Sequence, residues 1–297
     1  MKLTAGGVCA AKGFQASGVH CGIRKNQTKK DLALIFSAVP AKAAAVYTTN
    51  AVKGAPLLVT KQHLKNGMAQ AVICNSGNAN TCNANGVEIA EQMCTLAAEQ
   101  LHIDANDVLV ASTGVIGKVL DIQPIAEGIS PLVKNLGMNS KDAAHAIMTT
   151  DTTIKEIAVE FEVGGVVCRL GGIAKGTGMI HPNMATMLVF LTTDCAISAE
   201  MLKKALSSDV TQTFNMLSID GDTSTNDMVT VMANGLAGNA EISEEGEAFD
   251  TFMKALNTVT VHLCRSIAAD GEGATKLLEC VVTGAADETQ AKIAAKS

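Results

Sequence analysis

Aromatic residues are scarce in this 297-residue chain, which has no Trp, a single Tyr (Tyr47) and seven Phe. Because no stripe of basic residues is interleaved with aromatic ones, and the net charge is −6, nucleic acid is not expected as a partner. No apolar run approaches the length that spans a bilayer, so no membrane partner is expected either. The N-terminus lacks a continuous hydrophobic stretch after Lys2, which argues against a secretory signal and favours a cytoplasmic protein.

Cysteine is present, but without the spacing of a metal site. The nine cysteines are scattered, none forms a Cys-x-x-Cys pair, and most have apolar neighbours in the sequence. The six His are equally dispersed. We therefore predict reduced thiols in a reducing compartment, and neither a disulfide framework nor a metal site.

The composition is that of a globular protein with a large core. Hydrophobic residues make up 47% and charged residues 18% of the chain, and the apolar residues are mostly small and aliphatic. Strand-like and helix-like segments alternate, with no internal repeat and no Pro- or Ser-rich linker. This alternation predicts a layered α/β architecture.

Apolar periodicity and turn residues predict the individual elements. We expect a turn at Pro40 between two strands, a hairpin at Gly164-Gly165, and helix N-caps at Ser140 and Ser198. The predicted strands are 31–36, 43–48, 69–74, 108–111, 157–161, 166–170, 186–191, 228–233 and 277–282. The predicted helices are 56–64, 86–101, 122–136, 141–147, 198–214 and 249–268.

The most informative segment runs from Lys175 to Leu188 and joins a Gly-rich loop to an apolar strand. Its last small residue is Ala185, and the strand begins with the hydroxyl-bearing Thr186. A Thr at this junction can attack the preceding peptide bond and become a new N-terminus, which carries both a nucleophilic hydroxyl and an amine to act as its base. The segment thus predicts a self-cleaving acyltransferase, cut between Ala185 and Thr186.

Two further loops follow predicted strands or helices and could contribute to this chemistry. In Ser112-Thr113-Gly114, a hydroxyl and a Gly N–H could form an oxyanion hole, although an ordinary strand-ending turn is the alternative. Glu272 lies between two glycines and is either a solvated loop residue or a group that binds a substrate ammonium.

Two other Gly-rich or acidic segments are not favoured as ligand sites. Asp220–Asp227 has the look of a calcium loop, but its sixth and twelfth positions are Thr225 and Val231, so a hydrogen-bonded polar loop is the better interpretation. Gly176-Thr177-Gly178 lacks the third Gly and the Gly-Lys-Ser/Thr of phosphate-binding loops, which disfavours nucleotide binding.

At these residues the chain resembles the ornithine acetyltransferase family, also called the glutamate N-acetyltransferases of arginine biosynthesis. The resemblance covers essentially the whole chain in the family's order. It is carried by the segments 75–80, 112–117, 149–152, 175–188 and 220–227. Members of the family continue beyond Ser297, so we interpret the sequence as C-terminally truncated.

The resemblance implies a layered α-β-β-α sandwich of mixed sheets with an N-terminal-nucleophile-like architecture of the DmpA/ArgJ type. Cleavage would give an α piece, 1–185, with the oxyanion hole and a substrate-binding loop, and a β piece, 186–297, that starts at the nucleophile and lacks the family's C-terminal part. The two pieces would assemble as an α2β2 heterotetramer.

The resemblance also implies roles for individual residues. Thr186 would be the nucleophile, and Thr113 with Gly114 would form the oxyanion hole. The positions that contact substrate in the family correspond here to Thr149, Lys175, Thr186 and Glu272. The neighbouring Thr150 is the alternative to Thr149 as the residue that points inward.

The activity implied is acetyl transfer from N2-acetyl-L-ornithine to L-glutamate through an acetyl-threonine intermediate, without a cofactor. Whether acetyl-CoA also serves as a donor is left open. One alternative keeps Thr186 but uses water as acceptor, which would make the chain a self-processing amidohydrolase or aminopeptidase. Another is a non-catalytic binding protein whose Gly-rich loop is only a turn.

Overall fold

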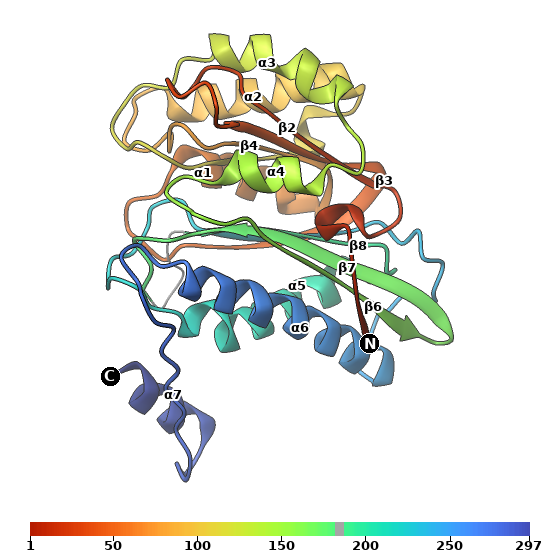
Figure 1. The fold of residues 1–297 in the computed structure, drawn as a ribbon. Helices are drawn as coiled ribbons and strands as arrows, with labels where there is room; N and C mark the ends of the chain where they lie inside the picture. The colour runs from red at the N-terminus through yellow and green to blue at the C-terminus, as the bar shows by residue number, and fades with distance from the viewer. Residues whose placement is uncertain (182–186) are drawn as a thin grey trace.

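The computed structural model describes residues 1–181 and 187–297 and arranges them in four layers, α-β-β-α (Figure 1). The strands of the described residues are β1 (Lys2–Thr4), β2 (Phe14–Val19), β3 (Leu32–Tyr47), β4 (Met68–Asn75), β5 (Val108–Ser112), β6 (Lys155–Val163), β7 (Val166–Lys175), β8 (Leu188–Thr193) and β9 (Met228–Ala233). The α-helices are α1 (Ala55–His63), α2 (Gly86–Leu101), α3 (Gln123–Lys134), α4 (Ser140–Ile147), α5 (Ala199–Gln212), α6 (Glu247–Ala269) and α7 (Glu288–Lys296).

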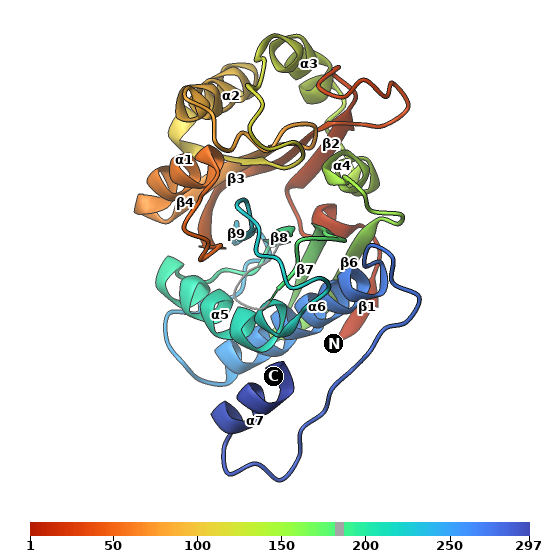
Figure 2. The same ribbon diagram turned by 90° about the vertical axis from the view of Figure 1, so that its left-hand side faces the viewer.

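The strands form one mixed sheet in the order β1-β6-β7-β8-β9-β3-β4-β5, with β2 also paired to β3. The pairs β4–β5 and β8–β9 are parallel, and the others are antiparallel. The sheet bends at β3, so that its two halves form the two inner layers (Figure 2). This arrangement confirms the predicted mixed α-β-β-α sandwich.

β3 is the strand that belongs to both halves of the sheet. Its first part pairs with β2 and β4, its last part, Lys42–Tyr47, pairs with β9, and the register with β4 shifts between Phe36 and Ala41. The prediction of two strands separated by a turn at Pro40 is therefore wrong. A proline has no N–H to donate to a ladder, and the shift in register accommodates Pro40 without ending the strand.

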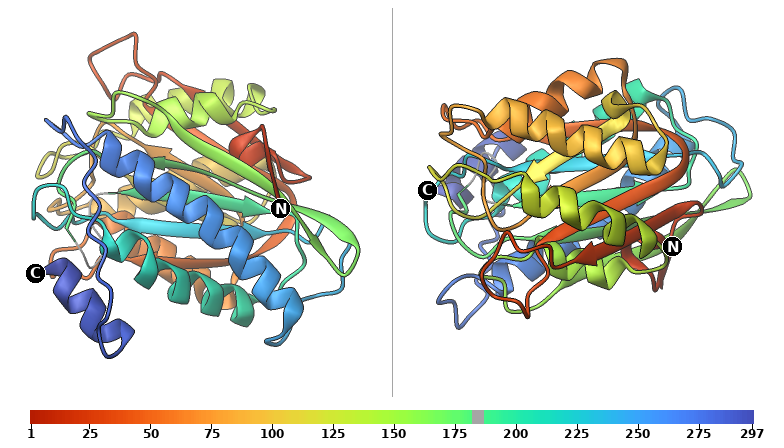
Figure 3. Two further views of the ribbon diagram at one scale, coloured as in Figure 1. Left: turned by 60° about the horizontal axis from the view of Figure 1, so that its bottom comes forward. Right: turned by 90° about the horizontal axis from the view of Figure 1, so that it is seen from above.

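Three hydrophobic clusters fill the three spaces between the layers. One cluster packs strands β6–β9 against α5 and α6, and it includes Phe161, Val189 and Phe252. Figure 3 shows α5 and α6 lying across that face of the sheet. A second joins the two inner layers and α4, and the third packs β2–β5 against α2 and α3. The sheet is thus buried on both faces, which explains the continuous apolar runs of its central strands.

Several local predictions can be checked directly. Gly164 and Gly165 have φ values of 57° and 80° and turn the β6–β7 hairpin, and Ser198 caps α5 by accepting from the Met201 N–H. Ser140 is not a cap, because its hydroxyl donates to Glu156 and accepts from the Val8 N–H.

The predicted strand 277–282 is absent from the structure. Leu278 is 88% exposed and Val281 is 73% exposed, and no described strand lies alongside to pair with them. An apolar run forms a strand only where a neighbour completes its hydrogen bonds. In the described part of the chain, no helix combines the length and hydrophobicity needed to cross a membrane.

Candidate active site

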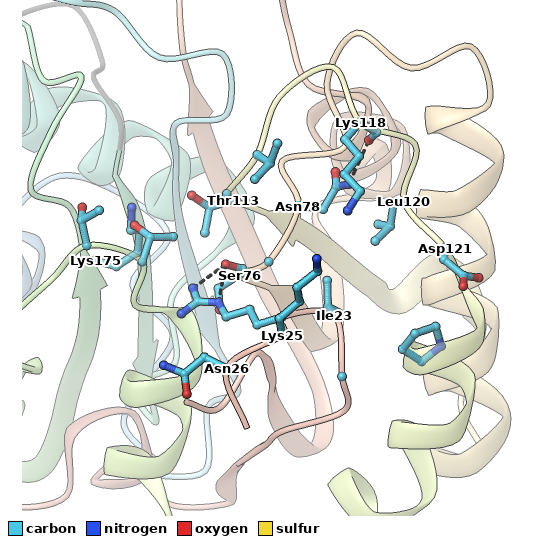
Figure 4. Close-up of a pocket in the computed structure, with 18 of the residues that line it drawn as sticks. Ile23, Lys25, Asn26, Ser76, Asn78, Thr113, Lys118, Leu120, Asp121 and Lys175 are labelled. Carbon is cyan, nitrogen blue, oxygen red and sulfur yellow. Dashed lines mark hydrogen bonds between the residues drawn. The ribbon is translucent and has the colours of Figure 1, made fainter. Parts of the chain in front are cut away.

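The C-terminal ends of β4, β5 and β7 open into a cavity of about 950 Å³. It is lined by the loops that follow these strands, by residues 22–26 and 118–121, and by Thr149, Thr150, Asp220 and Glu272 (Figure 4). The predicted site residues that line it are Thr113, Gly114, Thr149, Lys175 and Glu272. The predicted cleavage residues Ala185 and Thr186 lie outside the described residues.

The predicted oxyanion hole lies where the loops after β4 and β5 meet. Gly114 has φ of 124°, and a Cβ added to it would lie 2.6 Å from the carbonyl carbon of Gly77, so only glycine fits. Among the described residues, neither the Gly114 N–H nor the Thr113 hydroxyl has a hydrogen-bond partner. Two donors beside a cavity suit a negatively charged oxygen.

Amide side chains fix these two loops to each other. Asn75 Nδ2 donates to Ser112 Oγ at 2.7 Å, and Asn75 Oδ1 accepts the Gly77 and Asn78 N–H groups at 3.2 and 3.0 Å. Asn226 Nδ2 donates to the Ser112 carbonyl at 3.0 Å from the other side. The loop 220–227 is therefore a hydrogen-bonded polar loop that braces the loop after β5, in agreement with the interpretation from its sequence.

Lys175, the last residue of β7, lines the cavity. Its side chain is 2% exposed, yet Nζ makes no ion pair or hydrogen bond with any described residue. Burial lowers the pKa of Lys175 below its ordinary value, while the nearby carboxylates of Asp151 and Asp227 oppose that change. A buried amine that bonds no described residue could pair with the carboxylate of a ligand in the cavity, which would compensate its charge.

Negatively charged groups, in contrast, lie beside Gly178, which has two carboxylates close to it. A Cβ added to Gly178 would lie 2.8 Å from Glu272 Oε2 and 3.5 Å from Asp220 Oδ2. Both acids line the cavity, and Asp220 Oδ1 accepts the Ile180 N–H at 2.8 Å. This acidic end suits a ligand ammonium, and Asp220 is a member of it that sequence reasoning did not identify.

A buried ion-pair network supports the wall that carries Thr149 and Lys175. Asp151 Oδ1 accepts from Lys155 Nζ at 2.7 Å and from the Gly176 N–H at 2.8 Å, while Oδ2 accepts the Thr149 N–H at 3.0 Å. Lys155 also bonds Asp270 at 2.6 Å, two residues before Glu272. One carboxylate thus positions the backbone next to two predicted substrate contacts.

Thr149 and Thr150 both line the cavity. The Thr150 hydroxyl is hydrogen-bonded to the Thr177 hydroxyl. No described residue bonds the Thr149 hydroxyl, so it is the more available of the two for a ligand. This geometry favours Thr149 as the substrate contact.

Replacing Asp151 by Asn should lower the free energy of unfolding by roughly 3 kcal/mol at pH 7, because it leaves Lys155 with half of its buried counter-charge. Burial alone would raise the pKa of Asp151, but Lys175, Lys155 and the Gly176 N–H hold it below its usual range. A lowered carboxyl pKa gives stability that is complete above the unfolded pKa, about 3.9, and is lost as the pH falls through the folded pKa.

The difference between wild type and Asp151→Asn should therefore be constant from pH 7 to 5 and shrink only below about pH 4. Urea unfolding followed by far-ultraviolet circular dichroism measures it, since the chain has no Trp. Asp142→Asn, which loses only a surface ion pair to Lys30, is the control and should cost less than about 1 kcal/mol. A difference for Asp151→Asn that vanishes by pH 6 would contradict this account.

Sequence reasoning missed residues that act by holding others in place. Arg24 donates to the carbonyls of Ser76 and Met148 and so ties together two loops of the cavity. Asp151 and Asp270 both lie in segments singled out from the sequence, but only the fold reveals that Lys155 joins them. A polar residue next to a site residue is the only signal that the sequence offers for such roles.

Comparison with known proteins agrees with the fold and shows the family. The model of the ArgJ family matches residues 15–297. The "Arginine biosynthesis bifunctional protein ArgJ" of Listeria monocytogenes is 49% identical over 298 residues, covering 100% of this chain and 74% of that protein. This chain therefore corresponds to about three quarters of that relative's length.

Two solved structures are also similar. The ornithine acetyltransferase of Mycobacterium tuberculosis, solved with ornithine, is 37% identical, with a TM-score of 0.55 over 61% of this chain and 97% of that one. An L-aminopeptidase D-Ala-esterase/amidase of Ochrobactrum anthropi, described as a variant of the Ntn-hydrolase fold, is only 12% identical, with a TM-score of 0.54 over 92% of this chain and 88% of that one. The second likeness concerns the fold alone. Together with the matching family model, the close relatives establish that this chain belongs to the ArgJ family of acyltransferases.

Proposed function

We propose that this chain transfers an acetyl group from N2-acetyl-L-ornithine to L-glutamate, as a step of arginine biosynthesis in the cytoplasm. The observation that carries the proposal is the cavity itself, which combines two hydrogen-bond donors that bond no described residue, a buried lysine and a pair of carboxylates. An α-amino acid with a cationic side chain has groups to match each end. The names of the relatives support the pathway, and the ornithine in the solved relative supports the substrate.

The proposal requires self-cleavage between Ala185 and Thr186. Attack of the Thr186 hydroxyl on the Ala185 carbonyl, an N-to-O acyl shift and hydrolysis of the ester would release piece 1–185 and a piece that starts at Thr186. The solved ornithine acetyltransferase chain is matched over 97% of its length by 61% of this 297-residue chain, which is about 181 residues. That length is close to the one expected for the α piece and supports the division.

Acetyl transfer would then proceed in two half-reactions. The Thr186 hydroxyl attacks the acetyl carbonyl of acetylornithine while the free α-amine takes the hydroxyl proton. The tetrahedral oxyanion is stabilised by the Thr113 hydroxyl and the Gly114 N–H, and collapse releases ornithine with the proton on its amine. The amine of glutamate attacks the resulting acetyl-threonine ester in the same way, which regenerates the Thr186 hydroxyl and gives acetylglutamate.

The two ends of the cavity would orient the amino acids. Lys175 pairs with the α-carboxylate that both substrates share, and Glu272 recognises the cationic end of ornithine. Thr149 contributes a hydroxyl to the same wall. The acetyl group passes through Thr186 itself, so the cycle needs no cofactor.

The decisive experiment is a denaturing gel of the full-length protein with N-terminal sequencing and an acetyl-transfer assay. We expect two bands, a second sequence that reads Thr-Met-Leu-Val, and acetylglutamate formed from acetylornithine and glutamate. A single band that reads only from Met1 would exclude the proposal. Repeating the assay with acetyl-CoA in place of acetylornithine tests whether the chain also uses that donor.

Cleavage should not separate the two pieces. β8, from the β piece, pairs along its length with β7, from the α piece, and β9 pairs with β3. We propose that the pieces stay together and form an α2β2 heterotetramer, which light scattering coupled to gel filtration can measure.

Glu272→Gln should raise the KM for acetylornithine about 10-fold or more, because a neutral amide no longer compensates the ammonium. The KM for glutamate, which lacks that cation, should change less than about 3-fold. Asp222→Asn, an exposed change in the nearby polar loop, serves as the control. Equal changes in both KM values would show that Glu272 does not distinguish the substrates.

A second candidate function is hydrolysis, with water in place of glutamate, because the fold is shared with an aminopeptidase. Product analysis with and without glutamate separates the two. Ornithine released at the same rate without glutamate, with free acetate as the other product, would favour the hydrolase.

A further inference from the structure

Asp220 is a carboxylate at the cavity whose oxygens are already bonded to the backbone. Its Oδ2 accepts the Met179 N–H, and its Oδ1 accepts the Ile180 N–H at 2.8 Å and the Asp222 N–H at 3.2 Å. A carboxylate has about four lone-pair positions, so most of them are filled before any ligand binds. Asp220 is therefore better suited to hold the chain at 179–180 than to bind a substrate ammonium directly.

The backbone that Asp220 holds has an unfavourable conformation. Met179 has φ of 55°, in the left-handed region that residues with a long side chain rarely adopt. Such a conformation costs free energy and persists only where the surrounding structure enforces it. Ile180, the next residue, is fully buried in the core, and the hydrogen bonds from both residues to one carboxylate stabilise the turn between the cavity and the core.

Glu272 lies against the same part of the chain. Its N–H donates to the Thr177 carbonyl at 2.6 Å, and a Cβ added to Gly178 would lie 2.8 Å from Glu272 Oε2. The Glu272 side chain forms no hydrogen bond or ion pair with any described residue. The position of its carboxylate therefore depends on the backbone of Gly178, which directly precedes the residue that Asp220 holds.

A second carboxylate holds the other end of this segment. Asp151 Oδ1 accepts the Gly176 N–H at 2.8 Å, next to Lys175. Lys175 and Gly178 are three residues apart, a stretch that spans at most about 10 Å. In the proposed function, Lys175 binds the α-carboxylate of ornithine and Glu272 binds its terminal ammonium. The conformation of this short stretch then sets the distance between the two groups that bind the charged ends of the ligand.

We propose that Asp220 is a positioning residue that determines which length of diamino acid the cavity accepts. By holding 179–180 it fixes Gly178, and with it the position of the Glu272 carboxylate relative to Lys175. Ornithine, with three methylenes before its terminal ammonium, then reaches both groups, whereas lysine, with four, does not fit between them. The inference rests on the proposed function.

The test compares Nα-acetylornithine with Nα-acetyllysine as donors for the full-length wild type and for Asp220→Asn. The amide keeps an acceptor for Ile180 but turns a donor toward the Met179 N–H. One methylene is worth about 10- to 200-fold in kcat/KM, so the wild type should prefer acetylornithine by at least about 10-fold. In Asp220→Asn this preference should fall at least about 3-fold, because Met179 can relax and the Glu272 carboxylate loses its fixed position. Loss of the negative charge alone would weaken both cationic donors equally and leave the preference unchanged.

Gly178→Ala tests the same contact without removing a charge. Gly178 does not have a positive φ, so an Ala fits its backbone, and the added methyl group meets the flexible end of Glu272. The preference for acetylornithine should fall in this variant as well. Asp222→Asn is the matched control, because Asp222 is exposed, lies in the same loop and bonds no described residue through its side chain. It should leave the preference unchanged.

Titration calorimetry with ornithine and with lysine gives the same preference as a ratio of dissociation constants. It needs no turnover, so it also applies to a variant that is not cut. A wild-type protein that is neither cut nor active overturns the function proposed for the chain. An active wild type whose Asp220→Asn and Gly178→Ala variants keep the wild-type preference overturns only the role of Asp220. So does an active wild type that does not distinguish the two donors.

Discussion

Thr186→Ala should give a single uncut polypeptide and reduce acetyl transfer by at least about 10⁴-fold, because the proposed mechanism has no other group to carry the acetyl ester. The substitution removes the hydroxyl. Because it also prevents cleavage, the α-amine that would act as the base is never exposed. Both losses come from one substitution, which is why the expected effect is the largest. A denaturing gel and a coupled assay for ornithine release measure it.

Thr186→Ser is the matched variant, since it keeps the hydroxyl. It should be cut, although more slowly, and should retain measurable transfer. An active Thr186→Ala protein would refute the covalent mechanism, and an inactive, uncut Thr186→Ser protein would show that the hydroxyl alone is not sufficient for processing.

Gly114→Ala should reduce kcat by at least about 100-fold, the usual effect of losing one oxyanion donor. The added methyl group would lie 2.6 Å from the Gly77 carbonyl carbon and 2.8 Å from the Asn78 nitrogen, which are backbone atoms of a loop that Asn75 fixes by accepting the Gly77 and Asn78 N–H groups. The loop after β5 must therefore move, and the Gly114 N–H moves with it.

Gly117→Ala separates this effect from backbone strain. Gly117 lies in the same loop with φ of 74°, but an added Cβ meets nothing within 4 Å. It should cost about 1 kcal/mol of stability and leave kcat within about 3-fold. Equal losses of kcat in the two variants would mean that loop conformation in general, and not the position of one N–H, determines the rate.

Elements whose partners adjoin them in sequence were predictable. The β6–β7 hairpin needs only Gly164-Gly165, and the cap of α5 needs only Ser198, so both were identified. β3 was not, because whether Pro40 ends a strand depends on the register of β4, which the local sequence does not contain. Residues 277–282 had the pattern of a strand but no neighbour to pair with.

The candidate site divides in the same way. Motifs in the sequence predict Thr113, Gly114, Thr149, Lys175 and Glu272 as site residues, and the fold brings all of them to one cavity. Their roles stay predictions, as does that of Thr186. Asp151, Asp220 and Arg24 act through contacts with residues far away in the sequence, such as Arg24 with Met148, and such contacts exist only after folding.

The position of β8 inside the sheet affects how a cleaved molecule would refold. In the proposed maturation, its six register pairs with β7, from Leu188 to Thr193, would form while the backbone is still continuous, so the first folding event would be unimolecular. A nicked protein that has once been denatured must instead bring two polypeptides together, and its recovery should depend on concentration. Cleavage of this kind would produce the active enzyme but make its unfolding hard to reverse. The cleaved enzyme would then persist only as long as its unfolding is slow.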